Sequence, residues 1–167
     1  MQHESKHQSG HELIARGVIM RDGAVLANHS RNRKTETEYY ALPGSHVDPG
    51  ESCVAALQRE IIEEIGCDVM VGDLLFVSES LYPGRSEDDH QRHELVLYFE
   101  ATLQGTWRES DDRVESPEPG KDFRWLSLEE LSDANLLPRS VKEFLLNRKI
   151  HHTPQESPAY VFSDDTR

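Results

Sequence analysis

One stretch, residues 44–67, constrains the fold of this chain more than any other. It reads Gly-Ser-His-Val-Asp-Pro-Gly-Glu-Ser-Cys-Val-Ala-Ala-Leu-Gln-Arg-Glu-Ile-Ile-Glu-Glu-Ile-Gly-Cys. Its first part is a turn rich in glycine and proline, which leads into a helix that Ser52 can cap through its hydroxyl. Gly66 is the expected end of the helix, because glycine adopts the left-handed conformation at little cost. The stretch therefore predicts a turn followed by a capped helix.

This predicted helix carries its acids and its apolar residues on different faces. At about 100° per residue, Glu63 and Glu64 lie within about 60° of Glu60 on either side. Three carboxylates in one turn repel one another, and Arg59 alone does not balance them. We therefore expect a divalent cation with oxygen ligands, Mg²⁺ or Mn²⁺; the plainer interpretation is a solvated, glutamate-rich helix face. The opposite arc, expected to be buried, consists of Val54, Ala55, Leu57, Ile61, Ile62 and Ile65.

The stretch resembles the Nudix box: glycine, five residues, glutamate, seven residues, then Arg-Glu-aliphatic-any-Glu-Glu-any-Gly-aliphatic. Over residues 45–67 two positions depart from the box, because Ser45 replaces its opening glycine and Cys67 its closing aliphatic residue. Cys67 is a mild change, since a free cysteine packs like a small apolar residue. Ser45 is a larger change, since a position that favours glycine can require a positive φ. The residues in register are Glu51, Arg59, Glu60, Ile61, Glu63, Glu64 and Gly66.

The resemblance implies an α+β fold, a Nudix-type α/β/α sandwich with a mixed β-sheet between helices, over residues 12–148. Residues 1–11 are then a flexible N-terminus, and residues 149–167 form a C-terminal tail that is disordered or adds an edge strand. The pattern predicts a hairpin at Asp22-Gly23, polar loops over 29–38, 79–92 and 104–120, and a capping box that starts a helix at Ser127. Further elements are predicted as strands at 13–20, 25–28, 39–42, 69–78, 93–103 and 123–126, and a last helix at 139–148.

The resemblance also implies a hydrolase. In this family water attacks a phosphorus of a nucleoside diphosphate linked to a second group, and divalent ions polarise the phosphoryl oxygens and lower the pKa of the water. Arg59 would orient the acids by pairing with Glu51 or Glu63. The general base is left open between Glu60 and an acid of a later loop, Glu118 or Glu115. The metal ligands that the resemblance implies are Glu60, Glu63, Glu64 and the carbonyl oxygen of Gly44, and the catalytic residues are Glu60, Glu64, Arg59 and Glu118.

Substrate contacts are expected from basic and aromatic residues outside the box. Residues 29–38 bring several bases together, which form either an ordinary surface loop or a rim that meets substrate phosphates. Tyr82 either stacks on a base or packs on that rim, and Pro83 matches a proline found in relatives that cleave ADP-ribose. Mutated or damaged nucleoside triphosphates, ADP-ribose, nucleotide sugars and dinucleoside polyphosphates all remain as substrates. The candidate substrate-binding residues are Arg16, Arg31, Arg33 and Tyr82.

The charge of the chain limits its partners. With 31 acidic and 18 basic residues, the formal net charge is −13, which opposes binding to nucleic acid and to anionic membranes. It would also repel a nucleotide substrate unless bound cations reverse the local field. No apolar run approaches the roughly 20 residues that span a membrane, and the first residues lack an apolar signal segment. We expect a cytoplasmic protein with two free cysteines that is a monomer or a homodimer.

The alternative to an enzyme is a regulatory module of the same fold that binds a nucleotide.

Overall fold

The computed structural model describes residues 11–83 and 91–147 and the backbone of residues 159–164. Within these residues the chain forms one mixed sheet with three helices. The strands are β1 (His11–Arg21), β2 (Ala24–Arg31), β3 (Glu38–Ala41), β4 (Gly44–His46), β5 (Asp68–Tyr82), β6 (Arg92–Gln104), β7 (Glu109–Ser110), β8 (Arg113–Glu115), β9 (Asp122–Ser127), β10 (Leu136–Leu137) and β11 (Ala159–Asp164). The helices are α1 (Cys53–Ile65), α2 (Leu128–Asp133) and α3 (Arg139–Asn147).

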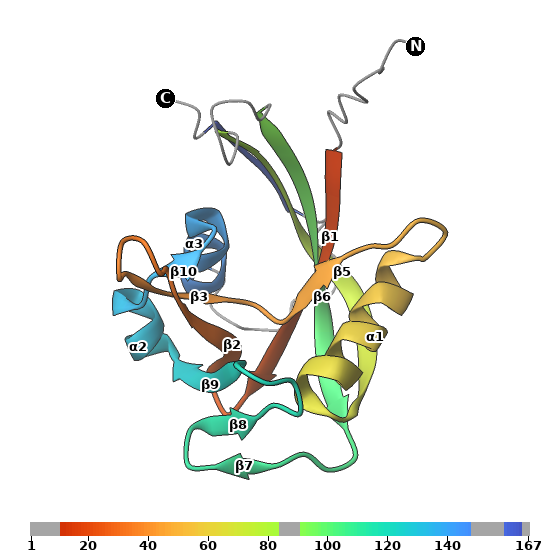
Figure 1. The fold of residues 1–167 in the computed structure, drawn as a ribbon, viewed down its shortest axis with the longest axis vertical. Coiled ribbons are helices and arrows are strands. Elements are labelled where there is room, and N and C mark those ends of the chain that lie inside the picture. The colour runs from red at the N-terminus through yellow and green to blue at the C-terminus, as the bar shows by residue number, and fades with distance from the viewer. Residues whose placement is uncertain (1–10, 84–90, 148–158, 165–167) are drawn as a thin grey trace, which may run out of the picture.

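The sheet lies between the helices, as predicted. Its main order is β11-β5-β6-β1-β2-β9-β8-β7, with β4 paired to β1 and β3 paired to β2 and β10. β1 runs parallel to β6, whereas β5 runs antiparallel to β6, so the sheet is mixed. α1 lies on one side of the strands, and α2 and α3 lie on the other (Figure 1). The expected α+β sandwich is therefore confirmed.

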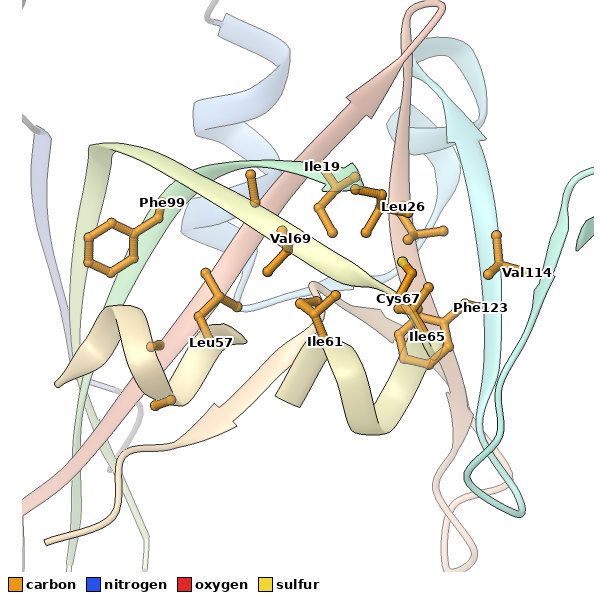
Figure 2. Packing of buried hydrophobic residues seen from close by; sticks show 14 of the residues in the cluster. Ile19, Leu26, Leu57, Ile61, Ile65, Cys67, Val69, Phe99, Val114 and Phe123 are labelled. Atoms are coloured by element: carbon orange, nitrogen blue, oxygen red, sulfur yellow. The ribbon is translucent and has the colours of Figure 1, made fainter. Parts of the chain in front are cut away.

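Two apolar clusters, one on each face of the sheet, hold the helices in place. On the α1 side, Leu57, Ile61 and Ile65 of the helix pack with Val69 and Phe99 of the sheet (Figure 2). On the other side, the α2 and α3 residues Leu131, Val141 and Leu145 pack with a group that includes Val18, Phe76 and Tyr98. Because neighbouring residues of β6 belong to different clusters, this strand is central and covered on both faces, as its continuous apolar sequence predicted.

Short-range signals placed the hairpin turn and the helix caps correctly, whereas residues 44–46, expected within a turn, form the strand β4 by pairing with β1. Asp22 and Gly23 have φ values of 50° and 78°, as a tight hairpin of the Asp-Gly type requires. Ser52 accepts a hydrogen bond from the backbone N–H of Ala55 and caps α1. Gly66 ends the helix in the left-handed conformation with φ 82°. Ser127 starts α2 with the complete capping box that its sequence indicated.

Elements that depend on distant pairing differ from the predictions. Residues 104–120, expected to be a loop, contain the short hairpin β7–β8, which pairs with β9. β2 and β5 are longer than predicted, because each continues along a neighbouring strand. In the C-terminal tail, β11 runs parallel to β5 as an edge strand, one of the two expected outcomes (Figure 1). In the described part of the chain, no helix combines the length and the apolar composition needed to cross a membrane.

Candidate active site

Gly44 fixes the loop that precedes α1. Its φ is 118°, and a Cβ atom built on it would lie 2.2 Å from the carbonyl oxygen of Ala15. β4 pairs with β1 at this point, with Ser45 opposite Ala15. Only glycine fits a backbone that approaches a neighbouring strand so closely.

Ser45 itself is not strained. It does not occur among the non-glycine residues with positive φ, which in the described part of the chain are Asp22, Glu36 and Asp111. Ser45 therefore carries no positive-φ strain, although the box has a glycine at this position. The conformation that needs glycine belongs to Gly44, one residue earlier, and Ser45 is an ordinary strand residue in β4.

Arg59 binds several acids around the start of α1. Its Nε and Nη2 atoms each lie 3.0 Å from an oxygen of Glu51. Its Nη1 atom donates to Glu60 at 2.5 Å and lies 3.7 Å from Glu63. The hydrogen bond from Arg59 lowers the pKa of Glu51, and the hydrogen bonds to Glu51 and Glu60 raise the pKa of the guanidinium. Arg59 therefore holds Glu60 in a fixed orientation. Of its two expected partners, Glu51 and Glu63, Glu51 lies closer to the guanidinium.

Glu64 is buried, which corrects the prediction that the acids lie on a face away from the core. Only 2% of the residue is exposed. On the expected apolar arc, Val54 is 40% exposed and Ile62 is 49% exposed. Ala56, which lies outside that arc, is fully buried. The buried face of α1 is thus rotated toward Glu64, whose carboxylate accepts a hydrogen bond from Gly44 of β4.

The Glu64 carboxylate has a partner on each oxygen. Oε2 accepts from the backbone N–H of Gly44 at 3.0 Å. Oε1 accepts from Nζ of Lys121, also at 3.0 Å. Burial raises the pKa of Glu64, while Lys121 and the Gly44 N–H act in the opposite direction. The carboxylate is therefore fixed between the loop before α1 and the segment before β9.

Lys121 was missed by the sequence analysis, since a single lysine in an acidic segment carries no local signal. Its segment reaches the box because it packs on the end of α1. A Cβ atom built on Gly66 would lie 3.5 Å from Cγ of Pro117. The Glu118 N–H donates to Ser116 Oγ at 3.0 Å, and the Lys121 N–H donates to the Glu118 carbonyl at 3.4 Å. These contacts place Glu118 and Lys121 beside the box.

Arg16 joins the same constellation from β1. Its Nη1 atom donates to the carbonyl oxygen of Gly44 at 3.1 Å and to that of Leu42. Both of these bonds use one nitrogen, and no carboxylate pairs with Arg16 among residues 11–83 and 91–147. The backbone of Gly44 therefore connects the two side chains: its carbonyl accepts from Arg16 and its N–H donates to the buried Glu64.

A family model described as the NUDIX domain matches residues 11–146. The chain belongs to this family. It is 32% identical over 93 residues to the CTP pyrophosphohydrolase of Escherichia coli strain K12, a match that covers 56% of this chain and 67% of that protein. It is also 32% identical over 99 residues to the low-salt glycan biosynthesis protein Agl8 of Haloferax volcanii, with 59% of each chain covered.

A solved structure supports the fold. The crystal structure of the mutator MutT protein from Bacillus halodurans superposes with a TM-score of 0.65 at 18% identity, covering 93% of this chain and 90% of that one. Together with the family match and the related pyrophosphohydrolase, the complete set of charged box residues identifies the chain as a Nudix hydrolase of pyrophosphate bonds. Its Cys67, at the last position of the box, is buried in the cluster under α1, so the exchange for an aliphatic residue preserves packing.

The Nudix residues predicted to contact substrate lie in different places. Arg16 belongs to the Gly44–Glu64 constellation. Arg31 pairs with Glu36 beside the β2–β3 loop, and Arg33 is exposed within that loop. Tyr82 lies at the end of β5, with the guanidinium carbon of Arg92 5.9 Å from the centre of its ring. In the described part of the chain no hydrogen bond or ion pair joins Arg31 or Arg33 to the box carboxylates.

The donor atoms of the Nudix box suit a hard divalent cation. Glu60, Glu63, Glu64 and the Gly44 carbonyl provide oxygen ligands, the kind that Mg²⁺ and Mn²⁺ prefer. Among the described residues, however, no three acidic, histidine or cysteine side chains already converge on one point. Two of the carboxylates pair with protein cations instead, because Arg59 binds Glu60 and the ammonium of Lys121 binds Glu64. The donor set fits the metal, and protein cations contact three of its members: Arg16 at the Gly44 carbonyl, Arg59 at Glu60 and Lys121 at Glu64.

Proposed function

We propose that the chain uses Mg²⁺ or Mn²⁺ to hydrolyse a phosphoanhydride bond in a nucleoside diphosphate linked to another group. One observation carries this proposal: the buried carboxylate of Glu64 is fixed by the backbone N–H of Gly44, one helical turn from Glu60. Burying a charged carboxylate is costly. A position that keeps one next to further oxygen donors is better explained by cation binding than by stability alone.

Each residue of the site has a part in this reaction. Glu60, Glu63, Glu64 and the carbonyl of Gly44 would hold the cation, and Arg59 would keep Glu60 oriented. The bound ion supplies charge neutralisation at the phosphoryl oxygens and activation of the attacking water. The guanidinium nitrogens of Arg16 beyond Nη1 would bind a substrate phosphate, since a planar guanidinium suits two phosphate oxygens. Glu118 or Glu60 would accept the proton of the water.

Nucleoside triphosphates are our first candidates for the substrate, supported by the similarity to a CTP pyrophosphohydrolase. Arg31, Arg33 and Tyr82 would then contact the outer parts of the nucleotide. The free thiols of Cys53 and Cys67 support a reducing compartment, the cytoplasm, as the place of action.

A substrate panel tests the proposal. The full chain would be incubated with Mg²⁺ or Mn²⁺ and CTP, other nucleoside triphosphates, ADP-ribose, nucleotide sugars or dinucleoside polyphosphates, and the products identified by mass. We expect metal-dependent cleavage into two phosphate-containing products, and none after chelation. Saturable nucleotide binding without a product from any compound would instead identify the regulatory module.

A further inference from the structure

Lys121 is the cation that accompanies the buried acid of the site. Its Nζ lies 3.0 Å from Oε1 of Glu64, whose side chain is 3% exposed, whereas that of Lys121 is 30% exposed. The nearby guanidinium of Arg59 is engaged elsewhere, with Asp48, Glu51, Glu60 and Glu63. In the described part of the chain, Lys121 is therefore the side chain that neutralises Glu64.

Glu64 needs such a partner when no metal is present. A buried carboxylate left without a counter-charge is strongly destabilising. The N–H of Gly44 orients Oε2 but neutralises no charge. The ammonium of Lys121 therefore supplies the counter-charge of Glu64 and holds its Oε1 toward the segment before β9.

The same contact conflicts with metal binding. Oε2 already accepts a hydrogen bond from the uncharged N–H of Gly44, whereas Oε1 is held by the charged ammonium of Lys121. A divalent ion at Glu64 therefore meets this ammonium at the same carboxylate. An ammonium and a divalent ion at one carboxylate repel each other strongly at such a distance.

We propose that Lys121 and the divalent ion exchange at Glu64. Without metal the ammonium holds the carboxylate, and when the ion binds the ammonium leaves Oε1. Lys121 then competes with the metal for Glu64 and lowers the affinity of the site for the metal. This inference rests on the proposed function in one respect, that Glu64 is a metal ligand.

The structure offers the displaced ammonium a place to go. Oε2 of Glu118 lies 3.9 Å from Nζ of Lys121, and the Glu118 side chain is 46% exposed. The backbone of this segment is held by the contact of Pro117 with Gly66 and by the turn between Glu118 and Lys121. The exchange therefore requires only that the flexible lysine stem changes rotamer. Lys121 is thus a positioning residue of the metal site.

The first test compares Lys121→Met with Lys34→Met, which removes the same charge from an exposed loop. Mn²⁺ is titrated calorimetrically without substrate, and thermal unfolding is measured with and without Mn²⁺. We expect Lys121→Met to bind Mn²⁺ about 10-fold more tightly, to have a lower Tm than the wild type without metal, and to regain the wild-type Tm at saturation. Lys34→Met should change neither quantity. Unchanged or weaker affinity, with the same loss of Tm in both conditions, would show that Lys121 only stabilises the fold.

A second measurement uses the wild-type chain. Acetylation of lysines by a small reagent, followed by mass spectrometry, reports how free each ammonium is. Mn²⁺ should accelerate the modification of Lys121 several-fold and leave that of Lys34 unchanged. If the chain binds Mn²⁺ but Lys121 is modified more slowly or at the same rate, the proposed exchange is wrong while the proposed metal site still stands. A wild-type chain that binds no Mn²⁺ would contradict the proposed metal site and the exchange together.

Discussion

Gly44 is the residue whose backbone the site can least change. It adopts φ 118°, and a Cβ atom there would lie 2.2 Å from the carbonyl oxygen of Ala15. We predict that Gly44→Ala loses roughly 1–3 kcal/mol of unfolding free energy from the backbone conformation alone, with a further loss from the clash. Ser45→Gly should be neutral or destabilising by up to about 1 kcal/mol, because glycine raises the entropy of the unfolded chain. Urea unfolding measures both, and a Ser45→Gly protein more stable than the wild type would contradict this assignment.

Glu118 and Glu60 differ in what holds them. Glu60 is fixed on α1 by Arg59, whereas Glu118 is half-exposed on the segment before β9. A carboxylate committed to metal is a poor base, so we propose Glu118 as the proton acceptor once substrate is bound. We predict that Glu118→Gln lowers kcat strongly and weakens metal binding by the free enzyme only slightly, because the pair of exposed Glu118 with Lys121 is weak. Glu60→Gln should harm both kcat and metal affinity. Steady-state kinetics over pH 6 to 9 test the assignment of the general base. An unaltered kcat in Glu118→Gln would assign the general base to Glu60 instead.

At the scale of elements, Glu12 of β1 ties together three strands. Its carboxylate binds Arg92 of β6 and His46 of β4. The hydrogen bond from Arg92, with a smaller contribution from His46, lowers the pKa of Glu12 from 4.5 to about 2. A depressed carboxyl pKa stabilises the folded chain above the unfolded pKa, and this stability is lost as the pH falls toward the folded pKa.

Arg92→Met should therefore destabilise the chain by about 1 kcal/mol at pH 7, given the partial exposure of the pair. The difference from the wild type should shrink as the pH falls from 4.5 toward 2. Unfolding free energies at several pH values measure it, and Arg139→Met, which removes an exposed pair with Glu143, should show little effect at any pH. If Arg92→Met loses the same unfolding free energy at every pH, the loss comes from packing of the arginine side chain and not from its ion pair with Glu12.

For the molecule as a whole, the sequence predicted what local chemistry determines. The Asp22-Gly23 turn, the Ser52 cap and the Gly66 end of α1 follow from the conformations that these residues prefer. The β7–β8 hairpin was missed because an acidic segment rich in proline and glycine becomes strand only by pairing with β9. Burial of Glu64 and its contact with Lys121 depend on how α1 packs against β4 and the segment before β9. The spacing of residues within the helix does not predict this packing.

The central claim is that the carboxylate of Glu64 serves a divalent metal in phosphoanhydride hydrolysis. The measurement is kcat at saturating Mg²⁺ on the best substrate of the panel, for the wild type, Glu64→Gln and Glu143→Gln, a distant exposed control. Circular dichroism and Tm establish that each variant is folded. Because charge stabilisation through a metal ligand is worth several kcal/mol, we predict that Glu64→Gln lowers kcat at least ~100-fold, while Glu143→Gln equals the wild type. A folded Glu64→Gln enzyme with near-normal kcat would contradict the account.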